Sequence, residues 1–410
     1  MRFTFVTLGC PKNEVDTEYY IKKLIGLGHT FVKDRDIADF IFLNTCAFIK
    51  DAISESMETY EELAEKYGKE RIIITGCLVE RLKHNLSGIK YIRGDDIEKV
   101  DAVINGKYVP DFSKRQHFIY KGDRYCRDSL PYAYVKIQEG CSRKCTFCTI
   151  PAIRGKPRFR SVKSITKEVE ILAKNGKKEI ILVGEDLTLY KDLLWLLDAL
   201  SSLKNVKLIR LMYLHPQGAK RELLQYMRDN PKIAKYIHIP IQHINGKVLK
   251  FMGRSGGERA VRKAMEYARK IVPNAFIRTE IMVGFPGEQD NHFEELLKFL
   301  EDIKIERIGV FKYSREEGTK SFSMEQVDED VKEERFQRAH LLASLLMEEA
   351  QKSLNGKRVR VIADTNFLGR TEYDAPSSDF TVKFKKPLEN GRIYRKKLVY
   401  KGDFELIITS

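Results

Sequence analysis

Short apolar runs that alternate with helix-like stretches constrain the fold of this chain more than any other feature. Three such runs near the N-terminus each end in a cysteine, at Phe3–Cys10, Phe40–Cys46 and Ile72–Cys77. Residues 15–27 and 53–67 between them are helix-like, so the order strand, helix, strand, helix, strand predicts a parallel sheet with helices on its faces. In such a sheet the carboxyl ends of the strands share one rim, where ligands bind.

The three cysteines at those strand ends form the first candidate site. Cys10, Cys46 and Cys77 stand 36 and 31 residues apart, too far for one local loop. Taken singly, each would most simply be a buried core cysteine. Because all three stand at strand ends, we expect them to hold an iron–sulfur cluster in which one iron lacks a protein ligand.

The alternation resumes from residue 132 with six further strand candidates. They are Tyr132–Ile137, Glu179–Val183, Val206–Tyr213, Tyr236–Ile241, Phe276–Val283 and Arg307–Tyr313. Each is followed by a helical or loop segment, which predicts a partial (β/α)6 barrel of the TIM type. Its functional residues should follow the carboxyl ends of the strands.

The loop after the first of these strands places three thiols within eight residues, at Cys141, Cys145 and Cys148. Thiolates this close together are typical ligands of a soft metal or an iron–sulfur cluster. Structural zinc is the alternative, but it needs four closed ligands, and no fourth Cys or His follows within reach of the loop. A four-iron cluster on three ligands leaves one iron open, which a small molecule should chelate.

Loops after the other barrel strands are weaker candidates. Gly184–Asp186 follows the second strand, Pro240–His243 the fourth and Gly284–Glu288 the fifth. An acid in the first of them could accept hydrogen bonds from a cofactor ammonium, although such motifs are more often only turns. His215, after the third strand, is more simply a loop histidine than a catalytic base.

The C-terminal part of the sequence changes character. A helix is predicted from Asp328 to Leu354, and its apolar stripe at positions 341, 342, 345 and 346 is most simply core packing. Short strand candidates then predict a small all-β barrel. These are Val359–Ala363, Phe380–Phe384, Lys397–Tyr400 and Phe404–Ile408. Residues 357–410 hold 12 Lys plus Arg against 7 Asp plus Glu, which fits contact with RNA or a ribosomal surface, or else a solvated face.

Residues 107–131 lose the apolar periodicity and contain Pro110, Gly122 and many charges, which predicts a linker. We therefore expect an N-terminal domain at 1–106, the linker at 107–131, the barrel core at 132–346 and the small β-barrel at 347–410. Cys126 lies in the linker without a companion thiol, and we interpret it as a bystander.

Composition limits the class of protein. The apolar fraction of 43% and the charged fraction of 32% are typical of a soluble globular protein. No run approaches the roughly 18 apolar residues of a membrane span, and the first residues lack a secretory signal, so we expect no membrane and a cytoplasmic location. An odd count of seven cysteines favours reduced thiols that serve as ligands over a disulfide framework. The net charge of +15 suggests nucleic acid or a ribonucleoprotein as partner, although a Lys-rich solvated surface gives the same number.

The loop spacing C-x3-C-x2-C, with Phe147 before its last cysteine, resembles the signature of radical S-adenosylmethionine enzymes. An N-terminal three-cysteine domain, this core and a C-terminal domain similar to TRAM together cover the whole chain and resemble the radical S-adenosylmethionine methylthiotransferase family. Six segments are similar to the branch of that family that modifies a ribosomal protein. They are Leu8–Asn13, Asn44–Phe48, Gly76–Leu78, Ile150–Pro151 followed by Arg154–Gly155, Tyr213–Pro216 and Gly369–Pro376.

The resemblance implies methylthiolation of an unactivated carbon, the β-carbon of an aspartate in small-subunit ribosomal protein twelve, in the context of the ribosome. It implies an electron donor as partner and, as cofactors, two [4Fe-4S] clusters and S-adenosyl-L-methionine. The cluster on Cys141, Cys145 and Cys148 would cleave the cofactor, and the cluster on the N-terminal three cysteines would hold the sulfur. Positions that resemble cofactor contacts are Phe147, Gly184, Glu185, Arg278 and Val283.

Two other functions stay open at this stage. A tRNA methylthiotransferase acting on a modified adenosine usually has Gln-Met or Arg-Thr where Pro11 and Lys12 stand, but the basic C-terminal barrel suits it. A ribosome-binding or redox scaffold would keep the clusters without turnover.

Overall fold

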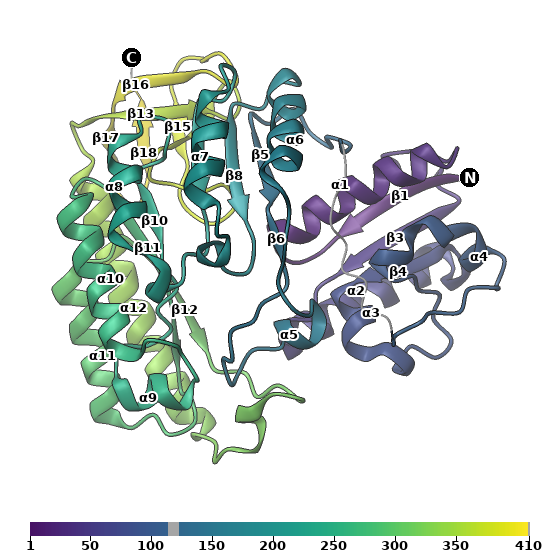
Figure 1. Ribbon diagram of the computed structural model, residues 1–410, viewed down its shortest axis with the longest axis horizontal. Coiled ribbons are helices and arrows are strands. Elements are labelled where there is room, and N and C mark those ends of the chain that lie inside the picture. Colours follow the sequence, from purple (N-terminus) through teal and green to yellow (C-terminus); the bar gives the residue numbers. More distant parts are fainter. Residues whose placement is uncertain (114–122, 409–410) are drawn as a thin grey trace. The chain divides into compact units, whose positions relative to one another are not determined.

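The computed structural model describes residues 1–113 and 123–408 of the chain, which forms two compact units (Figure 1). Unit 1 comprises Met1–Asp128, Lys136–Ser142 and Cys148–Ser164; unit 2 comprises Ser129–Val135, Arg143–Phe147 and Ile165–Ser410. Part of the predicted linker, residues 114–122, lies outside the described residues. The boundaries of the four predicted segments therefore stay a prediction.

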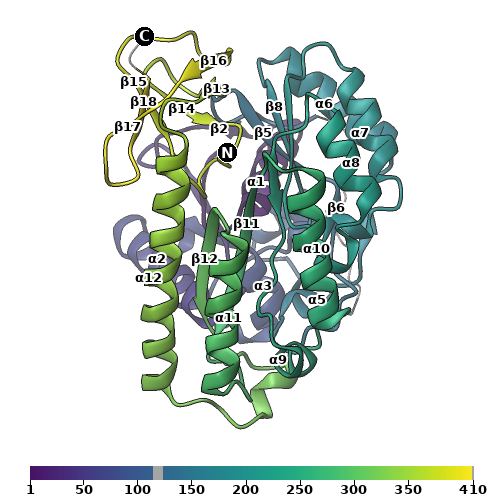
Figure 2. The ribbon, with the colours of Figure 1, turned by 90° about the vertical axis from the view of Figure 1, so that its left-hand side faces the viewer.

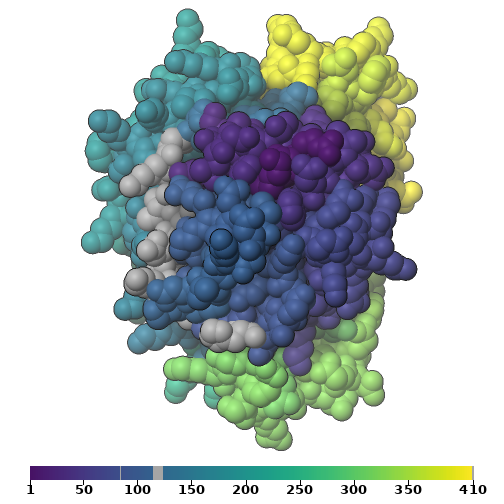
Figure 3. All heavy atoms as spheres, turned by 90° about the vertical axis from the view of Figure 1, so that its right-hand side faces the viewer, coloured from purple at the N-terminus to yellow at the C-terminus, as the bar shows by residue number. Residues whose placement is uncertain are grey.

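Unit 1 is built on a parallel sheet with the strand order β2-β1-β3-β4. Its elements are β1 (Arg2–Thr7), α1 (Pro11–Gly26), β2 (Thr30–Phe31), β3 (Phe40–Thr45), α2 (Lys50–Tyr67), β4 (Ile72–Gly76), α3 (Cys77–Leu82) and α4 (Val100–Ile104). The later segments add α5 (Ile150–Ile153) and the antiparallel pair β6 (Gln138–Glu139) and β7 (Arg158–Phe159). The predicted parallel sheet with helices is confirmed. In Figure 3 the N-terminal part of the chain, in purple and blue, forms one continuous area of the face shown.

Alternating side chains of β3 explain why helices cover both faces of this sheet. Ile41 and Leu43 are buried in a cluster with Leu63 of α2. Phe42 points the other way, because successive strand residues face opposite sides. There it stacks on Phe5, whose ring also stacks on Tyr20 of α1. Both faces of the sheet are thus apolar and need a helix.

Unit 2 contains the six predicted parallel strands. They are β5 (Tyr132–Lys136), β8 (Glu179–Val183), β9 (Leu208–Leu211), β10 (Tyr236–His238), β11 (Phe276–Val283) and β12 (Arg307–Lys312). Regular pairing gives the orders β5-β8-β9 and β10-β11-β12. An isolated parallel bridge between Ile209 and Ile233 and a 2.9 Å hydrogen bond from Leu214 N to the carbonyl of His238 join the two halves. The predicted partial barrel is confirmed.

Helices connect the barrel strands, as right-handed crossovers require. They are α6 (Val162–Lys174), α7 (Leu193–Ser202), α8 (Arg221–Asp229), α9 (Gly246–Phe251), α10 (Gly257–Ile271) and α11 (Asp290–Ile303), and α12 (Glu329–Ser353) follows the last barrel strand. Figure 2 shows α11 and α12 beside β11 and β12. All of the apolar residues Ile180–Val183 in β8 are fully buried, as expected for a parallel strand that is covered on both faces.

The C-terminal part of unit 2 is a curled half-barrel sheet with the order β16-β13-β14-β15-β18-β17. Its strands are β13 (Arg358–Ala363), β14 (Leu368–Thr371), β15 (Val382–Phe384), β16 (Ile393–Lys397), β17 (Val399–Tyr400) and β18 (Leu406–Ile408). All described pairs are antiparallel except β15 with β18. Val361, Leu398 and Leu406 lie fully buried inside the curl, next to Leu354, which follows α12. The small all-β fold predicted here is confirmed in this half-barrel form.

The prediction that the leucine stripe of α12 packs into the core is wrong. Leu341 and Leu345 are 63% and 56% exposed. The buried face carries Ala339 and Ala343 instead, together with Arg335. Small side chains let this helix approach β12 closely, so the leucines are turned toward solvent.

A segment of the C-terminal part, Arg370–Asp379, lies against the amino-terminal side of the barrel strands, and we call it the closing segment. Each of the six barrel strands gives it a polar contact. In chain order these are Tyr134 Oη to the Pro376 carbonyl, Glu179 to Arg370, Arg210 to the Glu372 carbonyl, Tyr236 Oη to Asp379, Arg278 to Asp379 and Arg307 to Asp374.

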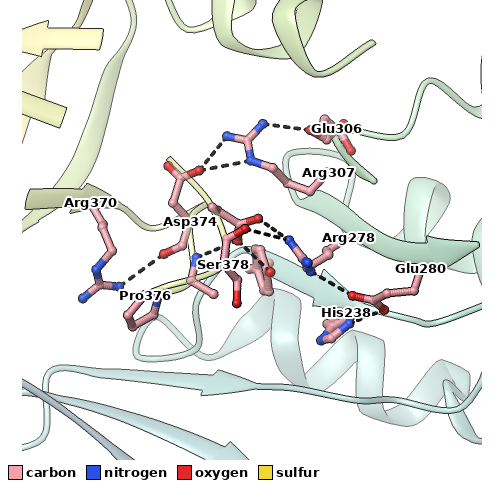
Figure 4. Close-up of polar contacts among 12 residues, drawn as sticks. His238, Arg278, Glu280, Glu306, Arg307, Arg370, Asp374, Pro376 and Ser378 are labelled. Carbon is pink, nitrogen blue, oxygen red and sulfur yellow. Dashed lines mark hydrogen bonds and ion pairs between the residues drawn. The ribbon is translucent and has the colours of Figure 1, made fainter. Parts of the chain in front are cut away.

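Figure 4 shows Arg278 and Arg307 reaching the closing segment from the strands. Arg307 forms a 2.6 Å ion pair with Asp374, and both side chains are 1% exposed. Glu179 is fully buried and paired with Arg210 and Arg370 at 2.8 Å each. Both cations hold the pKa of Glu179 below its usual range despite its burial. The end of the barrel opposite to the cysteine loop is therefore closed by charges from its own chain.

Candidate active site

The structure places the three N-terminal cysteines at the carboxyl ends of neighbouring strands. Cys10 directly precedes α1, Cys46 directly follows β3, and Cys77 is the first residue of α3 after β4. Because β1, β3 and β4 are adjacent in the sheet, the three ends share one rim, as the sequence predicted. Cys77 is buried, whereas Cys10 and Cys46 are partly exposed.

Glycine and asparagine side by side shape this rim. Gly9 has a φ of +88°, and a Cβ there would come within 2.7 Å of the Cys46 Cβ, so only glycine lets the two cysteine loops meet. Asn13 Nδ2 donates to the carbonyls of Leu8 and Thr45 at 2.9 and 3.0 Å. These bonds fix the first and second cysteine loops to each other.

The three thiols of the rim are chemically suited to bind a soft metal or an iron–sulfur cluster. Burial raises the pKa of the Cys77 thiol to about 11, and it raises the pKa of the Cys46 thiol as well. Nearby Arg154 opposes the rise at Cys77. Within residues 1–113 and 123–408, no three His, Cys, Asp or Glu side chains are arranged closely enough to hold a metal ion. Three thiols next to a guanidinium nevertheless match the needs of an anionic iron–sulfur cluster.

Arg154, from the short segment after α5, brings a positive charge to this rim. Its Nη2 donates to Asn13 Oδ1 at 2.6 Å and to Cys77 Sγ at 3.4 Å. Its Nη1 contacts Glu139 at 2.6 Å and Asp16 at 3.3 Å. The guanidinium is therefore fixed on both sides.

Lys136 completes a buried quartet of charges with Asp16, Glu139 and Arg154. Its Nζ lies 2.6 Å from Asp16 Oδ1 and also pairs with Glu139. The four side chains are at most 9% exposed. Lys136 and Arg154 together hold the pKa of Glu139 at about 2, so this carboxylate stays ionised although it is buried.

The second cysteine loop is anchored through the residues between its thiols. Cys141 N donates to the Gly155 carbonyl at 3.1 Å, and Thr149 Oγ1 donates to the Phe48 carbonyl at 2.9 Å. In unit 2, Thr146 N donates to the Met252 carbonyl at 2.9 Å. Gly253 makes this approach feasible, because a Cβ there would lie 2.5 Å from the Lys144 carbonyl oxygen.

Two arginines of unit 2 lie along that loop. Arg254 Nη1 is 3.7 Å from Cys145 Sγ, and its Nη2 donates to the Pro240 carbonyl. Arg143 pairs with Asp186 at 2.8 Å and donates to Gln217 at 2.9 Å. The sequence analysis pointed to an acid within Gly184–Asp186, after β8. One acid of this segment, Asp186, thus forms an ion pair with Arg143 of the cysteine loop.

The predicted cofactor positions fall in different places. Phe147 packs edge-on against Phe285 with ring centroids 6.2 Å apart. Gly184 and Glu185 follow β8, and Val283 ends β11, so these lie at carboxyl ends of strands. Arg278 is the third residue of β11, and its guanidinium already pairs with Glu280 and Asp379. Its role as a cofactor contact stays a prediction, as do the other four.

The histidines of the barrel loops have local roles in the described part of the chain. His215 Nδ1 accepts from Gln217 N at 3.2 Å, which supports the interpretation of a loop histidine. His243 is fully buried, and its Nε2 is 3.5 Å from Glu288.

Sequence reasoning missed Arg154, Lys136 and Glu139 as members of a site. Arg154 and Glu139 stand close to the cysteine loop in the chain, but nothing in the sequence pairs them with Asp16 or Cys77, more than 60 residues away. An excess of charged residues beside a buried strand was the only available signal.

Comparison with known proteins first defines the class. The sequence model described as the radical SAM superfamily matches residues 135–300, and the one described as uncharacterized protein family UPF0004 matches residues 2–93. A solved structure of the radical S-adenosylmethionine methyltransferase TsrM from Kitasatospora setae has a similar fold, with a TM-score of 0.58 and 12% identity over 87% of this chain and 76% of that one. The fold and the cysteine loop thus define a radical S-adenosylmethionine enzyme, a class that uses a [4Fe-4S] cluster and S-adenosylmethionine.

Closer relatives identify the family. The ribosomal protein uS12 methylthiotransferase RimO of Thermodesulfovibrio yellowstonii is 38% identical over 373 residues, which cover 88% of this chain and 87% of that protein. RimO of Thermotoga maritima is 39% identical over 404 residues, 93% of each. The chain belongs to the RimO family of radical S-adenosylmethionine methylthiotransferases.

The described residues include no helix that is both long and apolar enough to cross a membrane.

Proposed function

We propose that this protein methylthiolates the β-carbon of an aspartate in ribosomal protein uS12. The observation that carries the proposal is the rim on which Cys10, Cys46 and Cys77 follow adjacent parallel strands, in a chain that belongs to the RimO family. The C–H bond of such a carbon is too inert for acid–base chemistry. It needs a carbon radical together with a sulfur donor, which accounts for two cysteine sites in one protein.

Each triad has its own task in this proposal. With the clusters bound, Cys141, Cys145 and Cys148 would hold the one that cleaves S-adenosylmethionine, and Cys10, Cys46 and Cys77 the one that supplies the sulfur. An external electron donor is needed, because reduction precedes cleavage. Phe147, Gly184, Glu185 and Val283 would contact S-adenosylmethionine. Arg278 would do so only if it gave up its ion pairs with Glu280 and Asp379.

The C-terminal sheet is the part that we assign to docking on the ribosome. Nine of its basic side chains are exposed, and they are spread over β13, β15 and β16 and the turns next to β13, β15, β16 and β17. They are Lys357, Arg358, Lys383, Lys385, Lys386, Arg392, Arg395, Lys397 and Lys401. Such a surface suits ribosomal RNA next to uS12 better than uS12 itself, which as a ribosomal protein is basic. The reaction would then take place in the cytoplasm, where ribosomes are.

Reconstitution tests the proposal. Under anaerobic conditions the protein should take up about eight irons, and replacement of Cys141, Cys145 and Cys148 by Ala should halve that number. With a reductant, S-adenosylmethionine, sulfide and small ribosomal subunits, the mass of uS12 should rise by about 46 Da, since C–H becomes C–SCH3. Site mapping should place the added mass on an aspartate.

Transfer RNA in the same reaction provides the counter-test. The basic C-terminal sheet also suits tRNA, and methylthiolated adenosine in tRNA beside unmodified uS12 would overturn the proposal in favour of a tRNA enzyme. Cofactor binding without methionine or 5'-deoxyadenosine formation would favour a scaffold without turnover.

A further inference from the structure

We propose that Arg154 is a positioning residue for the N-terminal cluster, which holds the Cys77 sulfur and ties it to the segment that leads into the second cysteine loop. The inference rests on the proposed function, because it assumes that Cys10, Cys46 and Cys77 bind a cluster. It adds a role for residues that neither cysteine motif contains.

The geometry around Arg154 is that of a bridge. Its Nη2 donates to Cys77 Sγ at 3.4 Å, and its Nη1 reaches Glu139 at 2.6 Å. Glu139 stands two residues before Cys141 in the chain. One planar guanidinium therefore contacts a ligand of one cysteine triad and a neighbour of the other, all within unit 1.

The surroundings keep this guanidinium in place. Asn13 Oδ1 accepts from the same Nη2 at 2.6 Å, while Asn13 Nδ2 is bound to the carbonyls of Leu8 and Thr45. Asp16 lies 3.3 Å from Nη1 and is itself paired with Lys136. Because each neighbour has a second bond of its own, the guanidinium cannot turn away without breaking several contacts.

Charge accounting indicates why an arginine stands here. The quartet holds two cations, Lys136 and Arg154, and two carboxylates, Asp16 and Glu139, so it is neutral by itself. Burying a group of ion pairs costs desolvation energy even when its net charge is zero, and it often brings no net gain in stability. An N–H donor directed at Cys77 stabilises that sulfur most when the sulfur carries negative charge, as a cluster ligand does. The stabilisation is larger still when the cluster is reduced.

Two consequences follow for the reaction. N–H···S bonds and nearby positive charge stabilise the reduced form of an iron–sulfur cluster, so Arg154 should raise the reduction potential of the N-terminal cluster. By fixing Cys77 relative to Glu139, Arg154 should also hold the sulfur donor in one defined position. Without that bridge, S-adenosylmethionine cleavage should continue, but fewer cleavage events should end in product.

The first experiment measures the N-terminal cluster alone. In the background C141A/C145A/C148A, the midpoint potential of the remaining cluster is followed by electron paramagnetic resonance during a redox titration. Arg154→Gln should shift it to a more negative value. Arg154→Lys should shift it in the same direction by less, because an ammonium keeps the charge but cannot serve Cys77 and Glu139 in the fixed geometry of a guanidinium.

Arg93→Gln is the matched control. Arg93 lies in unit 1, is 4% exposed in its side chain and pairs with Glu80 and Asp95, so its loss tests the general effect of removing a buried arginine. If both Arg154 variants keep the parent potential, or shift it no more than Arg93→Gln does, the inference is wrong. A triple-cysteine background that binds no iron at all would instead contradict the proposed function.

The second experiment uses the enzyme with all cysteines. The ratio of methylthiolated uS12 to 5'-deoxyadenosine should fall about tenfold in Arg154→Gln, while the rate of 5'-deoxyadenosine formation stays within about twofold of the parent. An equal loss of methylthiolated uS12 and of 5'-deoxyadenosine would mean that Arg154 supports the fold and does not position Cys77. If Arg154→Gln is insoluble, Arg154→Lys decides the question, since a Lys variant with the parent ratio and the parent potential overturns the inference.

Discussion

Single cysteine substitutions should separate the two cysteine sites, because one is proposed to generate the radical and the other to supply sulfur. Cys145→Ala should abolish both 5'-deoxyadenosine and product. Cys46→Ala should still form 5'-deoxyadenosine under reduction but leave uS12 unmodified. Chromatography of the nucleosides and mass spectrometry of uS12 check this, with Cys126→Ala as the matched cysteine control that should retain both activities. Equal loss of cleavage in Cys46→Ala and Cys145→Ala, with the fold intact, would refute the division of tasks.

His215 should make stability depend on pH. Burial, with Arg254 and Arg143 nearby, lowers the pKa of His215 to about 2, whereas in the unfolded chain it is about 6.5. The unfolded state alone then takes up a proton below pH 6.5. Stability from neutral His215 is thus complete above that pH and is lost at about 1.4 kcal/mol per pH unit below it.

Replacement by asparagine removes that titration while keeping an acceptor for Gln217 N. Between pH 6.5 and 5, His215→Asn should therefore lose about 2 kcal/mol less unfolding free energy than the parent. Urea unfolding at several pH values measures the difference. His340→Asn, a change at an exposed histidine of α12, should leave the parent pH dependence intact. A similar pH slope in parent and His215→Asn would count against the neutral state of His215.

The closing segment should contribute to stability through its buried charges. Asp374→Ala leaves Arg307, whose side chain is 1% exposed, without its carboxylate. Loss of one partner of a buried ion pair costs about 3–5 kcal/mol. Equilibrium unfolding in urea should show this loss, and Asp374→Ala combined with Arg307→Met should be less unstable than the sum of the single changes.

An exposed pair supplies the comparison for that measurement. Replacement of Asp229, which is 63% exposed and paired with Arg228, by Ala should cost far less stability than replacement of Asp374, because solvent screens an exposed ion pair. A similarly small effect for Asp374→Ala would mean that the closing segment is held by its backbone contacts alone.

The sequence predicted those strands and helices whose residues carry a local pattern, such as an apolar run. The nine strands of the parallel sheets that were predicted have apolar runs, and each is present. β14 and β16 were missed because their residues, LGRT and IYRKK, are short or polar and find their partners only in the curled sheet. The exposure of Leu341 and Leu345 was missed for a related reason, since the alanines on the opposite face gave no hydrophobic stripe.

The candidate site divides in the same way. All six cysteines could be chosen from strand ends and spacing, which are local features. The bond from Arg154 to Cys77 joins residues 77 positions apart, and the closing segment meets strands that precede it by up to 242 positions. Such contacts follow from the order in which strands and loops come together in space, and no periodicity in the chain encodes them.

Charge distribution over the chain predicts how the enzyme responds to salt. If the exposed basic residues of the C-terminal sheet contact ribosomal RNA, KM for small ribosomal subunits should rise with salt, because binding then releases counterions. Neutralising Lys385 and Lys386 together to Gln should lower the slope of log KM against log salt by up to about 1.8, from roughly 0.7–0.9 per phosphate contact. The rate of S-adenosylmethionine cleavage without ribosomes should stay unchanged in this variant.

Lys204→Gln combined with Lys207→Gln is the matched control for that experiment, because it removes the same charge from exposed positions before β9. It should leave the slope close to that of the parent. If both double variants lower the slope equally, net charge alone steers the enzyme, and the C-terminal sheet is not the docking surface. If neither variant changes the slope while uS12 is still modified, the enzyme engages uS12 without RNA contact through Lys385 and Lys386.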